Sequence, residues 1–234
     1  MDVADLNGDG VDDLLLGAYQ CPRAATHAGA VFLVYGPITS SMYLADADAV
    51  LEGEVEMDHA GSSVDVGSDI DGDGLADAVI GAYYASDELD YAGAAYVVSG
   101  GEWTSGSLSG ATAKLLGPFA SARAGFSVAG LGDLHGDGYD DLAVGVLSGT
   151  SDGFDGGWGM SVVVPGPVAG TSYLVEAGEV LLGSKEAGSQ GHTVSSAGDV
   201  DADGVPDLAT ASYQNDTGGT NAGATYLFLM GQLD

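Results

Sequence analysis

Short apolar runs separated by glycines dominate the chain. A run of four residues at 14–17 is followed about a dozen residues later by a longer run at 29–35. The same pair recurs at 78–81 with 93–98, at 142–145 with 160–164, and at 208–211 with 223–229. The runs are continuous rather than alternating, so both faces of each strand should be covered. Helical periodicity is not convincing anywhere, and the pattern predicts an all-β protein of many short strands.

Four aspartate-rich loops stand directly before the first run of each pair. They occupy residues 5–13, 69–77, 133–141 and 199–207, with first residues 64, 64 and 66 positions apart. The last three loops are each preceded, five residues earlier, by a valine: Val64, Val128 and Val194. This period divides one domain into four repeats, 1–52, 53–116, 117–182 and 183–234. The first loop lies too close to residue 1 for such a valine, so the first repeat should lack its first strand.

Units of about four strands, buried on both faces and repeating every 60-odd residues, suit a radial stack of blades. A β-solenoid would repeat about every 20–30 residues. We therefore predict a β-propeller built of four-stranded antiparallel blades in four repeats, with three strands in the first and last. A segment of a larger propeller, a ring completed by another chain and a compact four-bladed ring all remain open. Unpaired propeller edges would allow self-association.

The residues around each loop resemble a known repeat. The segments 61–64 (GSSV) and 125–128 (GFSV), the aspartate loops, and 93–97 (GAAYV) together resemble the FG-GAP repeat of integrin α-subunit propellers and their bacterial relatives. The third repeat departs from this pattern at Gly159 and Met160. The resemblance implies a propeller with a calcium ion in the hairpin loop between the first and second strands of a blade.

The loop chemistry agrees with calcium, which takes six to eight oxygen ligands. Side chains at positions 1, 3 and 5 of a tight loop can converge, glycine at position 6 allows the turn, position 7 offers a carbonyl, and an acid follows at position 9. That last spacing and the flanking strands disfavour an EF-hand. The expected ligands are Asp5, Asn7, Asp9, the Val11 carbonyl and Asp13; Asp69, Asp71, Asp73, the Leu75 carbonyl and Asp77; Asp133, His135, Asp137, the Tyr139 carbonyl and Asp141; and Asp199, Asp201, Asp203, the Val205 carbonyl and Asp207. Imidazole is a poor calcium ligand, so of up to four Ca²⁺ ions the third should bind more weakly at His135, or water should fill the gap.

The charge of the chain excludes several classes of partner. Thirty-five acidic residues face four basic ones, for a net charge of −31. Nucleic acid would require a basic surface, and anionic membranes would repel the chain. No apolar stretch approaches the length of a membrane span. Metal sites account for part of the negative charge, while solubility and a halophile-like surface remain open explanations for the rest.

Location follows from the metal, because millimolar extracellular calcium would saturate even weak sites. We expect an extracellular or cell-surface protein. The start of the chain carries no signal peptide, and the repeats favour a piece of a longer precursor.

No catalytic set is recognisable. His27, His59, His135 and His192 occupy unrelated repeat positions, and Cys21 is the lone cysteine. His192 stands where the previous repeat has Phe126, so we expect it to pack there. We expect no enzyme, but a secreted binding, cell-adhesion or scaffold module for protein or glycan ligands. Its variable loops, 19–27, 83–91, 147–158 and 213–221, would supply the contacts, with Tyr84, Phe154 and Trp158 as candidates. The alternatives are an accessory propeller of a secreted hydrolase, a propeller enzyme with an unrecognised site, and a structural segment of a surface fibre.

Overall fold

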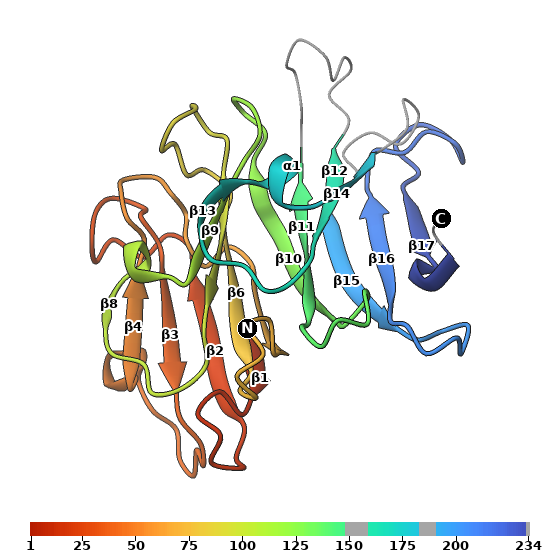
Figure 1. Cartoon of the computed structure of the whole chain (residues 1–234). Coiled ribbons are helices and arrows are strands. Elements are labelled where there is room, and N and C mark those ends of the chain that lie inside the picture. The colour runs from red at the N-terminus through yellow and green to blue at the C-terminus, as the bar shows by residue number, and fades with distance from the viewer. Residues whose placement is uncertain (148–158, 183–190, 233–234) are drawn as a thin grey trace.

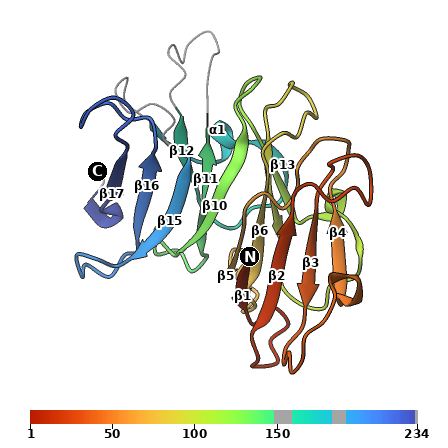
Figure 2. The same ribbon diagram turned by 180° about the vertical axis from the view of Figure 1, so that it is seen from behind.

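The computed structural model describes residues 1–147, 159–182 and 191–232. Within these residues the chain forms four sheets that stand side by side, and the main strands of each sheet come from one repeat (Figures 1 and 2). Neighbouring strands of a repeat are antiparallel. The sheets are arranged as the blades of a propeller that is not closed, which confirms the predicted all-β propeller architecture. Of the variable loops predicted to supply partner contacts, the one at 147–158 contains Phe154 and Trp158, which lie outside the described residues.

The strands keep the order of the repeats. The first sheet contains β1 (Asp2–Ala4), β2 (Asp13–Ala18), β3 (Ala30–Val34) and β4 (Ala49–Glu52). The second contains β5 (Val64–Ser68), β6 (Asp77–Ala82), β7 (Ala94–Val98) and β9 (Ala113–Leu116). The third contains β10 (Ala124–Gly132), β11 (Asp141–Val146), β12 (Met160–Val164) and β14 (Glu179–Leu182), and the fourth contains β15 (Thr193–Gly198), β16 (Asp207–Ser212) and β17 (Ala224–Phe228).

Helical structure is limited to single turns. These are η1 (Leu44–Asp46), η2 (Leu108–Gly110), α1 (Leu174–Ala177) and η3 (Met230–Gln232). No helix in the described part of the chain is long and apolar enough to cross a membrane.

The first repeat has a first strand, which corrects the prediction that it lacks one. Residues 2–4 form β1, which pairs with β2 so that Val3 lies opposite Leu14. The prediction relied on a valine five residues before the loop. A strand three residues long, however, needs only extended backbone beside a partner that offers ladder hydrogen bonds.

Two short strands tie neighbouring blades together. β8 (Gly106–Ser107) belongs to the second repeat but pairs in parallel with β4, and β13 (Gly170–Tyr173) belongs to the third repeat but pairs in parallel with β9. Each therefore covers the outer edge of the preceding blade with a segment of the next one. Backbone groups paired in this way are no longer free to recruit another chain.

The continuous apolar runs place alternate side chains against opposite neighbours. In β6, Ala78, Ile80 and Ala82 belong to the core shared with the first sheet, where they meet Leu15 and Leu33. Val79, on the other face of β6, belongs to the core shared with the third sheet. A third core, which includes Ala143, Val163, Val194 and Leu208, joins the third sheet to the fourth. Each fully buried aliphatic side chain contributes about 1.5–3 kcal/mol, so these inter-blade cores hold the arc together.

Glycine pairs mark the closest approach of neighbouring blades. A Cβ atom on Gly17 would overlap the carbonyl oxygen of Gly61, and a Cβ atom on Gly81 would overlap that of Gly125. Gly145 stands in the same relation to Gly191. At each of the three junctions, the second strand of one blade thus lies directly against the backbone that leads into the next blade.

We predict that Gly81→Ala lowers the free energy of unfolding by about 2 kcal/mol, because the added methyl group must push two backbones apart. Gly110→Ala is the matched control, since a Cβ atom there has open space and the backbone is not in the left-handed region. Urea unfolding of both variants measures the difference. Equal stability of the two would show that the blades are not in close contact at Gly81.

Candidate metal centres

All four aspartate loops lie at one end of the sheets, between the first and second strands (Figure 1). Two glycines give each of the first three loops its turn: in the first loop Gly8 has φ 76° and Gly10 has φ 86°. In the fourth loop Ala202 takes the place of the first glycine at φ 62°, and Gly204 keeps the second. This left-handed backbone folds each loop back over its own first residue.

The first aspartate of a loop organises that turn through backbone hydrogen bonds. The Asp5 carboxylate accepts the amides of Gly8 at 2.8 Å, Asp9 at 3.1 Å and Gly10 at 2.8 Å. Asp133 accepts the equivalent amides of Gly136, Asp137 and Gly138. These bonds, led by the one from Gly138, hold the pKa of Asp133 below its usual range.

The last aspartate of each loop is fully buried and ties the loop to the third strand. Oδ2 of Asp77 accepts the amide of Ile70 at 2.8 Å, while Oδ1 accepts the amide of Gly100, just beyond β7, at 2.8 Å. The same bridge is built by Asp13 between Leu6 and Gly36, by Asp141 between Leu134 and Gly166, and by Asp207 between Val200 and Met230. Burial raises the pKa of Asp77 to about 6.

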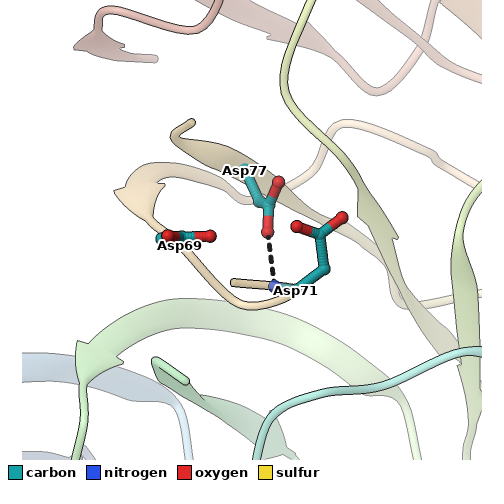
Figure 3. Close-up of side chains that lie close together, drawn as sticks. All are labelled: Asp69, Asp71 and Asp77. Carbon is teal, nitrogen blue, oxygen red and sulfur yellow. Dashed lines mark hydrogen bonds between the residues drawn. The ribbon is translucent and has the colours of Figure 1, made fainter. Parts of the chain in front are cut away.

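Two of the loops bring three carboxylates together. Asp69, Asp71 and Asp77 each offer an oxygen within 4.8 Å of the others, as do Asp199, Asp201 and Asp207. Figure 3 shows the first group, with the backbone nitrogen of Asp71 donating to the carboxylate of Asp77 at 3.1 Å. One oxygen of this group, Oδ1 of Asp69, is buried without a hydrogen-bond partner among the described residues.

This donor set fits a hard cation. Carboxylate oxygens suit calcium rather than zinc or copper, which prefer nitrogen or sulfur ligands. A cation would also satisfy the unpartnered oxygen of Asp69 and offset the repulsion of three neighbouring negative charges. The residues of the second and fourth loops can therefore hold a metal ion.

The first and third loops differ at their third position. In the first loop the amide oxygen of Asn7 accepts the Asp9 amide at 3.0 Å. In the third loop Nδ1 of His135 lies 2.8 Å from Oδ2 of Asp141. This hydrogen bond raises the pKa of His135, so the imidazole is paired with the carboxylate that a cation would otherwise use.

The fifth-position aspartates lie outside the three-carboxylate groups. Oδ1 of Asp9 accepts the amide of Val11 at 2.9 Å, and Asp73, Asp137 and Asp203 cap Leu75, Tyr139 and Val205 in the same way. The role of these side chains, and of the carbonyls at position 7, as ligands remains a prediction.

Sequence reasoning missed a contact between two of the loops. Oδ2 of Asp140 accepts the amide of Asp69 at 2.9 Å, and the Asp140 amide donates to the Asp69 carbonyl at 3.0 Å. Burial, and the charge of Asp69 beside it, raise the pKa of Asp140. The second and fourth loops have Ala76 and Pro206 at this position, and no spacing rule predicts an inter-blade bond.

The opposite end of the sheets carries a row of rings that crosses all four repeats. The row runs from Tyr19 to His59 (5.6 Å between centroids), Tyr83 (5.3 Å), Phe126 (5.4 Å), His192 (5.0 Å) and Tyr213 (4.6 Å). We call these six residues the aromatic row. His192 therefore packs against Phe126, the residue that occupies the equivalent position in the previous repeat.

Further rings and one cation surround the centre of the aromatic row. Tyr84 lies 5.0 Å from His59, and Arg123 lies over the Tyr84 ring at 5.4 Å. Nδ1 of His59 is 3.0 Å from the Tyr83 hydroxyl, and burial together with nearby His27 lowers the pKa of His59. A hollow of about 280 Å³ opens between Tyr19, Ser62, Tyr83 and Phe126. The fold thus gathers three of the four histidines that occupy unrelated repeat positions.

Comparison with known proteins gives consistent similarities. The family model described as FG-GAP repeat matches residues 1–34, 60–98 and 191–228. The chain is 32% identical to integrin alpha-V of Gallus gallus over 224 residues, covering 92% of this chain and 20% of that protein. It is 33% identical to integrin alpha-7 of Rattus norvegicus over 195 residues (82% and 16%). It is 39% identical to phosphatidylinositol-glycan-specific phospholipase D of Bos taurus over 108 residues (43% and 13%). The chain spans a fifth or less of these relatives.

We predict that His135→Asp strengthens calcium binding by the third loop, because it restores the third-position carboxylate of the second and fourth loops and frees Asp141 from its histidine. Calorimetric titration should then show one additional ion per chain, or about tenfold tighter binding of the weakest one. Asn221→Asp adds the same negative charge at the other end of the sheets and should leave the titration unchanged. A His135→Asp chain that binds calcium like the wild type would contradict this assignment.

Proposed function

Because the chain belongs to the FG-GAP, integrin α-like family of β-propellers, we propose that it is an extracellular, calcium-stabilised module that binds protein or glycan partners in adhesion or as a scaffold. The two ends of the blades divide these tasks. The aspartate loops stabilise the blades at one end, and the aromatic row provides the contact surface at the other.

The aromatic row is the observation that carries the proposal. Tyr19 and Tyr213, at its two ends, are 43% and 49% exposed, although Phe126 and His59 between them pack against their neighbours. Tyrosine is enriched in binding surfaces because it offers a large apolar ring with a polar tip and loses little conformational entropy when it is fixed. A row that crosses every described blade presents these rings on one rigid support, which favours recognition of an extended partner.

Calcium would be held by Asp69, Asp71 and Asp77 in the second loop and by Asp199, Asp201 and Asp207 in the fourth. The first loop offers the Asn7 amide oxygen in place of a carboxylate, and the third would bind most weakly because of His135. The ion supplies the positive charge that offsets carboxylate repulsion within each loop. At a hundredfold excess over Kd, one such site stabilises the fold by about 2.7 kcal/mol. Extracellular calcium reaches the millimolar concentrations that weak sites need.

A second candidate function is an accessory propeller of a secreted hydrolase. The similarity to phosphatidylinositol-glycan-specific phospholipase D over 43% of the chain favours it. The aspartates gathered in the loops would then have the same stabilising role, and catalysis would belong to another part of the protein. Hydrolysis of glycan or ester substrates by this chain alone, persisting in chelator, would instead indicate a propeller enzyme.

We predict that replacing the exposed ends of the aromatic row, in the double variant Tyr19→Ser and Tyr213→Ser, weakens partner binding at least about tenfold, as expected for tyrosines that anchor an interface. Binding is measured by biolayer interferometry against panels of extracellular-matrix proteins and immobilised glycans in calcium. Tyr43→Ser is the matched control, since Tyr43 is 82% exposed and lies beside η1, between β3 and β4 at the aspartate-loop end. If Tyr43→Ser lost as much affinity, or if no panel member bound the wild type, the aromatic row would not be a binding surface.

A further inference from the structure

A cavity of about 390 Å³ lies at the outer edge of the second sheet and shares no residue with the aspartate loops or the aromatic row. It forms where β13 joins β9, and the loop between β6 and β7 closes one side. Its polar lining comes from Glu54, Asp87, Glu88, Ser109, Lys114 and Thr171. These residues come from the second and third repeats, so the cavity exists only in the assembled blades.

Lys114 stands at the centre of the polar lining. Its Nζ atom lies 2.6 Å from Oε1 of Glu54 and 2.6 Å from Oδ1 of Asp87, and its side chain is 13% exposed. The hydroxyl of Tyr96, which is 1% exposed, donates to the same Glu54 oxygen at 2.8 Å. Burial opposes the charge of the lysine, but Asp87 and Glu54 raise its pKa overall. The ammonium group is thus fixed in place and charged.

The chain has four basic residues, and neither of the other two that the structure describes lies in this cavity. Arg23 pairs with Glu52 at the surface, Arg123 lies over a ring near the aromatic row, and Lys185 is outside the described residues. Lys114 is the basic side chain that the described structure places in a cavity wall, where it balances two of the three carboxylates of the lining.

We propose that this cavity binds a neutral, polyhydroxylated ligand of the sugar class. Sugar hydroxyls both donate and accept hydrogen bonds, and the lining offers both kinds of group: carboxylate oxygens accept, while the ammonium of Lys114 and the hydroxyls of Ser109 and Thr171 donate. The buried side chains of Leu108 and Leu116 form an apolar wall suited to the C–H face of a sugar ring. An anionic ligand would be repelled by the carboxylates, and a cationic one would find Glu54 and Asp87 already paired with Lys114 and Glu88 already accepting the hydroxyl of Tyr173.

The inference deepens the glycan part of the proposed function, but it uses a different surface. Variants of the aromatic row should leave sugar binding at this cavity unchanged, and variants of the cavity should leave partner binding by the aromatic row unchanged. The two proposals can therefore fail separately.

The test titrates the calcium-loaded chain with glucose, galactose, mannose, N-acetylglucosamine, lactose and maltose, followed by saturation-transfer NMR and calorimetry. We expect at least one sugar to bind, with Lys114→Met weakening binding at least about tenfold and Thr171→Val about fivefold, the weight of one ordinary hydrogen bond. Thr220→Val, at an exposed site in the fourth repeat, is the control and should bind normally. Thr171 is exposed, so its variant reports on binding even if Lys114→Met fails to fold.

Three results would overturn the proposal. The first is no binding of any sugar up to about 50 mM, beyond the weakest useful affinity. The second is sugar binding that Thr171→Val and Lys114→Met leave unchanged, which would place the sugar elsewhere. The third is binding of arginine amide that is tighter than the binding of any of the sugars and that Thr171→Val weakens, which would make this a site for organic cations.

Discussion

In each blade, one buried carboxylate accepts hydrogen bonds at both of its oxygens and thereby fixes the shape of the blade. Asp13, Asp77, Asp141 and Asp207 are all inaccessible to solvent, and each accepts one amide from its own loop and another from the residue beyond the third strand. A buried charge is tolerated only when it is paired with hydrogen bonds or a cation. These bonds fix the position of the loop, and the loop then places the other aspartates beside the buried one. The candidate metal centres in the second and fourth loops are therefore a consequence of how the blade is closed.

The two ends of the blades face opposite physical demands. At the loop end, negative charges gather closely and gain from a cation. At the other end, rings from successive repeats touch each other in the aromatic row, where burial lowers the pKa of His59. Between the ends, glycine pairs such as Gly81 and Gly125 and the alternating apolar side chains of strands such as β6 keep neighbouring blades in contact. The proposed division of tasks, with stabilisation at one end and recognition at the other, depends on this contact between blades.

Much of the fold could be predicted from the sequence because its signals are local and repeated. Continuous apolar runs predicted strands covered on both faces, and β6 shows this directly. The predictions failed where contacts are not local: β1 needs only a partner strand, and the pairing of β8 with β4 and of β13 with β9 crosses from one repeat to the next. In the second and fourth loops, spacing predicted that the aspartates at positions 1, 3 and 9 come near one another. It could not predict that His135 pairs with Asp141, that Asp140 reaches Asp69, or that fifth-position aspartates such as Asp73 cap the backbone. His59 and His192 occupy unrelated repeat positions, yet both lie in the aromatic row because the connections that carry them end on the same side of the sheets.

The most direct test of the account is thermal unfolding of the chain in excess calcium, in excess magnesium and in chelator, with bound calcium counted by titration. Calcium should raise the melting temperature relative to chelator with at least two ions bound per chain. Magnesium should raise it much less, because it demands a tighter octahedral site than these loops supply. An unchanged melting temperature and no bound calcium would contradict the claim that the gathered carboxylates are metal centres.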